Sequence, residues 1–313
     1  MSGIHHVTAI SGKAERNLQF YRHALGLRFV KKTVNFDDPG TYHLYYGDRV
    51  GHPGTILTFF PWEHAAPGRG GVGQASETSF RVPADSMGYW THRLVEKGVT
   101  HENPIKRFGE TVLSFSDPDG MRLALVGVAG AATEQTWTDC DIPAEHAIRG
   151  FHGVTLLLHT VTPTAAVLRD VLGFKDAGQD GSVSRFQATE TVGGLVDLHQ
   201  AGGFLAGRQG RGSVHHVAFR APDDATQAVM AQKLVAAHNL HPTQQLDRNY
   251  FRSIYFREPG GVLFEIATDQ PGFAVDEPVE TLGHDLKLPR FLEPRRQQIE
   301  AALPPLPATE EAA

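Results

Sequence analysis

The chain has 313 residues, 41% hydrophobic and 20% charged, with a formal net charge of −6 and a single cysteine, Cys140. This is a globular composition long enough for two domains, and it lacks the long basic run that nucleic-acid binding favours. A single cysteine excludes an intrachain disulfide and a thiolate metal cluster. No apolar run is long enough to span a bilayer, and residues 1–6 do not begin a signal peptide. We therefore expect a cytoplasmic protein without membrane contact.

The first predicted unit begins with an apolar strand over residues 4–10, which opens with the letters IHHV. A polar break follows, and apolar residues at helical spacing predict a helix over 17–25. Gly26 stands where a helix C-cap is expected. The extended segment that follows Gly26 continues the unit.

The same order of features returns after residue 150. A strand begins at Phe151-His152-Gly153-Val154, a helix is predicted over 162–171, and Gly173 follows it. Since a strand, a helix and a capping glycine recur in the same order, the two segments are interpreted as copies of one structural unit.

Two further units follow these copies. Residues 77–83 (ETSFRVP) resemble residues 216–222 (HVAFRAP), and both segments lead into amphipathic helices. Both units later reach a tight turn, DPDG at 117–120 and EPGG at 258–261, and then a final strand. The sequence therefore predicts four units, each with one strand, one helix and three strands, over residues 3–60, 75–128, 148–200 and 211–270.

The predicted fold class is α+β, with four βαβββ modules in which neighbouring modules pair into two domains. The domains are expected at residues 1–128 and 148–270, joined by a linker at 129–147. Residues 271–313 form a C-terminal extension, with one amphipathic helix near 290–303 and a disordered tail rich in Pro, Ala and Glu.

Two His-His dipeptides and one acid are the candidate functional residues. His6 and His216 each lie in a strand start, and Glu265 lies inside the otherwise apolar strand 262–267. Two histidines and one carboxylate are the protein ligands of a facial-triad iron site. An isolated strand histidine is more often a packing residue, and Glu265 has Arg248 or Arg257 as alternative partners, so spacing alone leaves the metal site open.

A family resemblance adds to this evidence. The repeated units and the His-His-Val openings resemble the vicinal oxygen chelate superfamily, which includes glyoxalase I, extradiol dioxygenases and bleomycin-resistance proteins. Within it, the chain is most similar to the ring-cleaving branch that contains 2,6-dichlorohydroquinone 1,2-dioxygenases and hydroquinone dioxygenases. The resemblance covers the chain to about residue 303 and is carried by residues 27–33 (LRFVKKT), 42–46 (YHLYY), 53–55 (PGT), 149–152 (RGFH), 250–255 (YFRSIY) and 282–287 (LGHDLK).

The resemblance implies an extradiol-type ring-cleaving dioxygenase that uses Fe(II), with Mn(II) as the alternative metal. Its partners would be O2 and a small aromatic substrate of the hydroquinone or catechol type, and the family also allows a homo-oligomer. The implied metal ligands are His6, His216 and Glu265, and the implied catalytic residues around them are His5, Thr8, His215, Arg248 and Tyr255. Because the first and fourth units share the site, we expect the two domains to meet face to face around it.

Two other functions remain open at this point. A glyoxalase-like lyase or isomerase would use the same site with a divalent metal, and Glu77 is its candidate fourth ligand. A resistance-type protein would sequester an aromatic compound without chemistry. Asp197 beside His152 does not complete a second triad, so one metal per chain is expected. The remaining histidines are interpreted as mostly surface or packing residues, including His43, His64, His101, His199 and His284.

Overall fold

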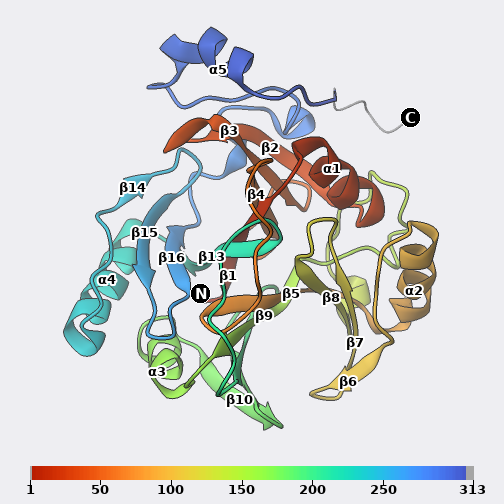
Figure 1. Cartoon of the computed structure of the whole chain (residues 1–313), viewed down its shortest axis with the longest axis vertical. Coiled ribbons are helices and arrows are strands. Elements are labelled where there is room, and N and C mark those ends of the chain that lie inside the picture. The colour runs from red at the N-terminus through yellow and green to blue at the C-terminus, as the bar shows by residue number, and fades with distance from the viewer. Residues whose placement is uncertain (1, 308–313) are drawn as a thin grey trace.

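The computed structural model describes residues 2–307, which form two curled eight-stranded sheets with a few helices (Figure 1). The first sheet has the strand order β14 (Leu246–Asp247), β15 (Arg252–Arg257), β16 (Leu263–Thr268), β13 (Ser213–Ala221), β1 (Ile4–Ser11), β4 (Ile56–Pro61), β3 (Asp38–Gly47) and β2 (Arg28–Asn35). The second has the order β10 (Lys175–Asp180), β11 (Val183–Gln187), β12 (Leu195–Gln200), β9 (Phe151–Leu158), β5 (Gln74–Pro83), β8 (Arg122–Val128), β7 (Glu110–Ser116) and β6 (Ile105–Arg107).

One helix follows the first strand of each module, so the predicted α+β class and the four βαβββ modules are confirmed. The helices are α1 (Ala14–Gln19), which continues as a π-helical turn over Phe20–Ala24, α2 (Met87–Glu96), α3 (Thr162–Asp170) and α4 (Asp224–His238). Gly26 (φ 68°) and Gly173 (φ 74°) follow the first and third of them in the left-handed conformation that glycine adopts readily. Among residues 2–307, no helix is long and apolar enough to cross a membrane.

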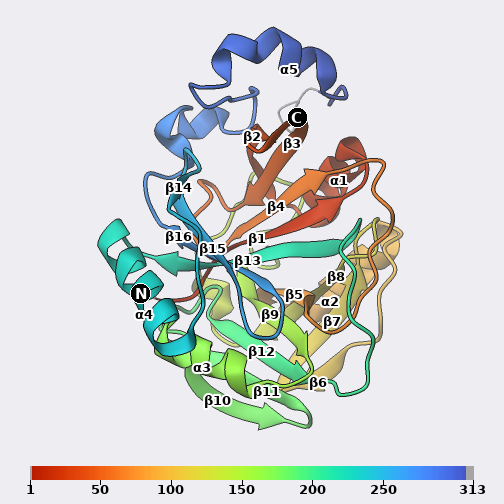
Figure 2. The same cartoon turned by 60° about the vertical axis from the view of Figure 1, so that its left-hand side comes forward.

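The first sheet joins modules that are remote in the sequence, and the second sheet joins two consecutive modules. β1 of the first module pairs antiparallel with β13 of the fourth, and β5 of the second pairs antiparallel with β9 of the third. The first and fourth modules therefore form one sheet, and the second and third modules form the other (Figure 2). The strand pattern did not reveal this because an apolar face is equally compatible with either partner. The predicted residue bounds of the two domains stay a prediction.

Side chains alternate along the strands of the first sheet, so one set lies in the hydrophobic core and the other lies on the concave face. Val7 and Ala9 on β1, Phe219 on β13, and Phe264 and Ile266 on β16 are all buried in the main hydrophobic cluster. Full burial of the Val, Phe and Ile side chains among them is worth roughly 1.5–3 kcal/mol each. The intervening residues of the same strands point to the opposite, concave face, where the site lies.

Two buried carboxylates in the tight turns connect the sheets. Asp117, before β8, accepts hydrogen bonds from the backbone N–H groups of Asp119 (2.9 Å) and Met121 (2.8 Å) and from the hydroxyl of Tyr21 (3.0 Å). Glu258, before β16, accepts from Gly260 N and Val262 N and from the hydroxyl of Thr164. Each turn thus binds the helical segment of a module in the other sheet, which explains why both turns carry an acid.

Asp117 should make stability depend on pH. Burial raises the pKa of its carboxyl from 3.8 to about 6, so the folded state retains a proton that the unfolded state releases. The free energy of unfolding should therefore fall as pH rises from about 4 to about 6. Asp117→Asn keeps an acceptor oxygen for the turn without the charge, and we expect it to be more stable than wild type at pH 7 by on the order of 1–3 kcal/mol.

Urea unfolding of both proteins at pH 4 and pH 7 measures this effect. At pH 4 the stabilities of Asp117→Asn and wild type should be close, because the wild-type carboxyl is then largely protonated in the folded state. A difference of the same size at both pH values would rule out the titration as its cause.

The C-terminal extension packs against the first sheet (Figure 1). A single-residue bridge joins Lys32 of β2 to Leu286, and Tyr42 donates its hydroxyl hydrogen to the carbonyl of Pro304 (3.0 Å). The predicted helix near 290–303 is present as α5 (Arg296–Ala302), preceded by a 3-10 turn over Glu293–Arg295. Of the tail that was predicted to be disordered, residues 303–307 have no regular secondary structure, and residues 308–313 lie outside the described part of the chain.

Candidate metal centre

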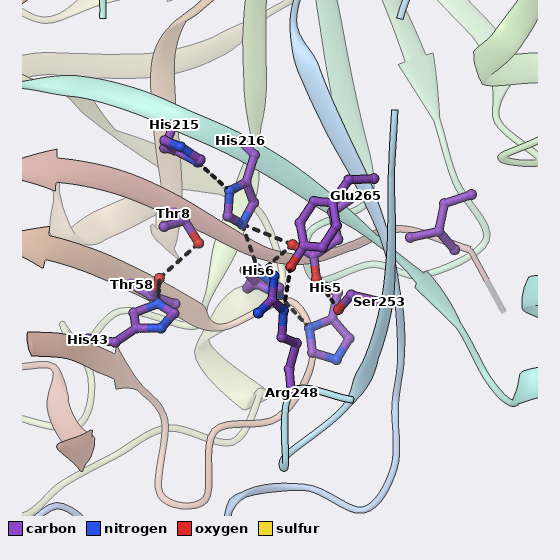
Figure 3. Close-up of polar contacts among 12 residues, drawn as sticks. His5, His6, Thr8, His43, Thr58, His215, His216, Arg248, Ser253 and Glu265 are labelled. Atoms are coloured by element: carbon purple, nitrogen blue, oxygen red, sulfur yellow. Dashed lines mark hydrogen bonds and ion pairs between the residues drawn. The ribbon is translucent and has the colours of Figure 1, made fainter. Parts of the chain in front are cut away.

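The side chains of His6, His216 and Glu265 converge on one point of the concave face (Figure 3). His6 Nε2 lies 3.3 Å from His216 Nε2 and 3.3 Å from Glu265 Oε2, and His216 Nε2 lies 2.9 Å from Glu265 Oε2. Ligand atoms at right angles around a metal, each about 2.1 Å from it, are separated by about 3 Å. The three ligand atoms are therefore already spaced as one face of a metal coordination shell.

The three residues come from adjacent strands of the first sheet. His6 on β1 pairs with Ala218 on β13, which pairs with Glu265 on β16. Two residues further along β1, Thr8 pairs with His216 on β13. Laterally paired residues point to the same face of a sheet. The site therefore lies within a single sheet, and the expectation that two domains meet face to face around it is wrong, because the first and fourth modules form one continuous sheet.

β-bulges set the positions of the other two histidines. Between Ile4 and His6 the ladder to β13 skips His5, and between Val214 and His216 the ladder to β1 skips His215. An extra residue in a bulge rotates its side chain out of strict alternation. Each bulged histidine consequently reaches its neighbour: His5 Nδ1 lies 2.9 Å from His6 Nδ1, and His215 Nδ1 lies 2.8 Å from His216 Nδ1.

These paired nitrogens allow the tautomers that the candidate ligands need. Burial lowers the pKa of His5 well below its usual value and that of His215 to about 3, so both are neutral imidazoles. A neutral imidazole has one N–H and one acceptor nitrogen, and it can accept through Nδ1 from the Nδ1–H of its neighbour. His6 and His216 then present unprotonated Nε2 atoms, as metal ligands do. The predicted supporting role of His5 and His215 thus has a geometric basis.

The carboxylate has an atom that only a cation would satisfy. Glu265 Oε2 is buried and has no hydrogen bond to any residue within 2–307. Two nitrogen lone pairs and a carboxylate oxygen that face one another repel unless a positive ion lies between them. The donor set therefore fits a divalent metal.

Ser253 on β15 supports this carboxylate and was not identified as a site residue from the sequence. Its hydroxyl donates a short hydrogen bond to Glu265 Oε1, which orients Oε2 toward the two histidines. Loss of a partner that orients a ligand usually weakens metal binding about 10–100-fold. We expect Ser253→Ala to have this effect in an equilibrium metal titration monitored by bound metal per chain.

A matched control for Ser253→Ala is Ser79→Ala, since the Ser79 hydroxyl donates to the Gly153 carbonyl in the second sheet. The control should bind metal as wild type does. Unchanged metal affinity in Ser253→Ala would mean that the hydrogen bond does not orient the ligand.

The triad opens into a cavity of about 350 Å³. Of the predicted catalytic residues, His215, Arg248 and Tyr255 line it, whereas His5 and Thr8 do not. His5 lies behind His6, and Thr8 hydrogen-bonds Thr58 (2.8 Å), one strand away. The wall is otherwise largely apolar, with Phe36, Phe60, Trp62, Phe251 and Leu263.

Two polar residues of β3, His43 and Tyr45, also line this cavity. The sequence grouped His43 with histidines interpreted as mostly surface or packing residues, whereas in the structure it is hydrogen-bonded to both Tyr45 and Thr58. The alternation in residues 42–46 (YHLYY) could have indicated that positions 43 and 45 share a face, but nothing local shows that this face is the one that carries the triad.

The second sheet holds the equivalent positions without a metal-binding set. By ladder register, Gly153, Glu77 and Ala124 occupy the places of His6, His216 and Glu265. Glu77 pairs with Arg107 (2.8 Å), so it is not a fourth ligand of the triad, and the lyase hypothesis loses its candidate. His152 pairs with Glu110 (3.0 Å) and Asp197 with Arg185 (2.8 Å), so this face is filled with ion pairs.

Known proteins share both the sequence and the fold. A family model described as the glyoxalase/bleomycin resistance protein/dioxygenase superfamily matches residues 3–125. A Bacillus subtilis protein named ring-cleaving dioxygenase MhqO is 46% identical over 308 residues, 98% of this chain and 97% of its own length. A Sphingobium indicum protein named chlorohydroquinone/hydroquinone 1,2-dioxygenase is 34% identical over 94% of this chain and 93% of its own. A crystal structure of a Bacillus subtilis protein that is 46% identical to this chain superimposes with a TM-score of 0.92 over 98% of both chains.

Proposed function

Because the chain belongs to the glyoxalase/bleomycin resistance protein/dioxygenase superfamily, we propose that it is an Fe(II)-dependent ring-cleaving dioxygenase acting on a hydroquinone- or catechol-type ring with O2. The observation that carries the proposal is the triad of His6, His216 and Glu265 at one end of a largely aromatic cavity. A three-residue ligand set leaves coordination positions free for exogenous ligands, as ring cleavage requires. Mn(II), which favours similar ligands, is the alternative metal.

Bound Fe(II) would supply the redox chemistry and the positions at which substrate oxygen and O2 are brought together. The protein's own residues bind and orient the ring. The aromatic side chains of Phe60, Trp62 and Phe251 line the cavity, and Phe251 also packs on the His6 ring at 5.0 Å between centroids. These contacts exclude water and restrict the ring to a few orientations.

Arg248 and Tyr255 are suited to stabilise negative charge on a substrate oxygen. Arg248 Nε donates to the Tyr255 hydroxyl (3.3 Å), and its Nη2 donates to Asp37 Oδ2 at the cavity mouth (3.0 Å). Burial raises the pKa of Tyr255, so its hydroxyl stays protonated and can itself donate a hydrogen bond. A fixed guanidinium and a neutral phenol near the triad are the kind of donors that stabilise developing anionic charge.

The test is anaerobic loading of the apo-protein with Fe(II), followed by O2 uptake with hydroquinone, chlorohydroquinone and catechol. A Zn(II)-loaded sample separates redox from Lewis-acid chemistry, and a Mn(II)-loaded sample tests the alternative metal. In the Fe(II) sample of wild type, O2 consumption should equal the amount of ring cleaved. His216→Ala should lose this activity. Glu77→Ala, which changes the position equivalent to His216 in the second sheet, should retain it. A filled metal site that consumes no O2 with any of the three rings would refute the proposed reaction.

A further inference from the structure

A buried chain of hydrogen bonds runs from the strand that carries His6 to the far wall of the cavity. Thr8 Oγ1 lies 2.8 Å from Thr58 Oγ1, which lies 2.8 Å from His43 Nε2, and His43 Nδ1 lies 2.8 Å from the Tyr45 hydroxyl. Figure 3 shows Thr8, Thr58 and His43 as a group beside the triad. All four residues are largely shielded from solvent, and the last two line the cavity.

The register of the first sheet brings these residues together. Thr8 on β1 pairs with Thr58 on β4, and Thr58 pairs with Tyr45 on β3, so the three point to the same face. His43 lies two residues before Tyr45 and shares that face, while Leu44 and Tyr46 point into the hydrophobic core. The chain is therefore a polar row on the concave face, next to the row that carries His6 and Glu265.

The row holds the Tyr45 hydroxyl in place but leaves it hydrogen-bonding capacity. Burial lowers the pKa of His43 well below its usual value, so its ring is neutral, with one donor and one acceptor nitrogen. The ring is also held between the Tyr45 ring (4.1 Å between centroids) and the Phe60 ring (4.3 Å). His43 is the one hydrogen-bond partner of the Tyr45 hydroxyl among residues 2–307, and a phenol can both donate and accept.

Tyr45 lines the same cavity as the triad but from a different part of the sheet. β3 is two strands from β1, so the backbones of these strands lie about 10 Å apart along the sheet. Both Tyr45 and the three triad residues line the one cavity. On a six-membered ring held by one oxygen at the triad, an oxygen on the opposite carbon points away from the triad, whereas an oxygen on the adjacent carbon stays beside it.

We propose that the Tyr45 hydroxyl, oriented by His43, binds the ring oxygen of the substrate that the metal does not hold. This inference rests on the proposed function and assigns a role to two residues of the same cavity. Tyr45 is then a specificity-determining residue that favours rings with a second, distant oxygen. His43 is a positioning residue, and because it is neutral the pair can either accept from a substrate hydroxyl or donate to a carbonyl oxygen.

The experiment compares two probes, hydroquinone and phenol, which differ by one oxygen. Each is titrated anaerobically by calorimetry into Fe(II)-loaded wild type and into Tyr45→Phe, with bound iron measured in every sample. A hydrogen bond of this kind is worth about tenfold in affinity. Wild type should therefore prefer hydroquinone to phenol about tenfold, and Tyr45→Phe should lose that preference while its phenol affinity is unchanged.

The matched control is Tyr46→Phe, the next residue on β3. Its hydroxyl donates to Asn17 in the core (2.8 Å), on the face away from the cavity, so this variant should keep the preference for hydroquinone. His43→Phe, which fills the space but removes the partner of Tyr45, should reduce the preference without changing phenol binding. Recovery of the preference in His43→Gln, which restores an acceptor, would support orientation rather than packing.

Three outcomes would overturn the inference. Equal weakening of both probes in Tyr45→Phe would reduce Tyr45 to a packing residue. If Tyr45→Phe binds hydroquinone and phenol with the affinities of wild type, the second oxygen of hydroquinone does not bind Tyr45. O2 uptake by the same samples would then show that the proposed function nevertheless holds. Failure of wild type to bind either probe or to consume O2 would refute the proposed function, and the inference with it.

Discussion

Glu265→Gln is expected to weaken metal binding strongly while the protein remains folded. The substitution keeps the shape of the side chain and a partner for Ser253, but it replaces the anionic Oε2 that faces His6 and His216. A neutral amide cannot supply the negative charge that a divalent ion requires at this position. We therefore expect metal affinity to fall by at least about 100-fold, the upper end of what loss of a supporting partner costs.

Metal-dependent stabilisation measures this loss without reference to activity. Fe(II) or Mn(II) at 100 times its dissociation constant should stabilise wild type by about 2.7 kcal/mol, a gain that Glu265→Gln should lack. Glu77→Gln is the matched control, since Glu77 occupies the place of His216 in the second sheet, and it should keep the full gain. Equal stabilisation of Glu265→Gln and wild type by the metal would show that the triad is not the binding site.

Lys31→Met should cause the largest loss of stability. Lys31 on β2 is fully buried, and its Nζ donates to Glu277 Oε2 (2.8 Å) and Asp276 Oδ1 (2.7 Å) of the C-terminal extension. Removing one partner of a buried ion pair leaves an uncompensated charge and typically costs 3–5 kcal/mol. Glu277, itself buried, would be the carboxylate left without its cation.

Urea unfolding at pH 7 measures the effect, with Lys32→Met as the control. Lys32 is the next residue of β2 and only half-buried, so its replacement should change stability by much less. The double variant Lys31→Met/Glu277→Gln should recover part of the loss, because it also removes the stranded charge. A loss below about 1 kcal/mol in Lys31→Met would mean that the pair contributes no more than a surface ion pair.

The same ion pair supports the candidate site. Asp276 also accepts hydrogen bonds from the Tyr250 hydroxyl (2.9 Å) and from Asn249 Nδ2 (3.2 Å). These two residues lie between Arg248 and Phe251, which line the cavity. Lys31→Met should therefore also loosen the cavity wall, which makes the C-terminal extension part of the site's structure rather than an appendage.

The sequence alone determined the order of the elements and the chemical types at the centre of the site. Helical periodicity, the glycines at 26 and 173, and the DPDG and EPGG turns depend on residues close in the chain, so they predict the four modules correctly. His6, His216 and Glu265 were identifiable because a histidine pair at strand starts and an acid within an apolar strand are costly unless they bind something. The structure brings these three together.

Only the tertiary structure decided which modules share a sheet, and with it most of the site's surroundings. The triad joins residues 210 positions apart, and alternation in a strand gives the facing side but not the neighbouring strand. The bulges at His5 and His215, the Ser253 hydrogen bond, the His43–Tyr45 pair and the Lys31–Glu277 ion pair all arise from contacts between strands or between a strand and the extension. Such contacts depend on long-range pairing, whose free energy is not set by the local pattern of either segment.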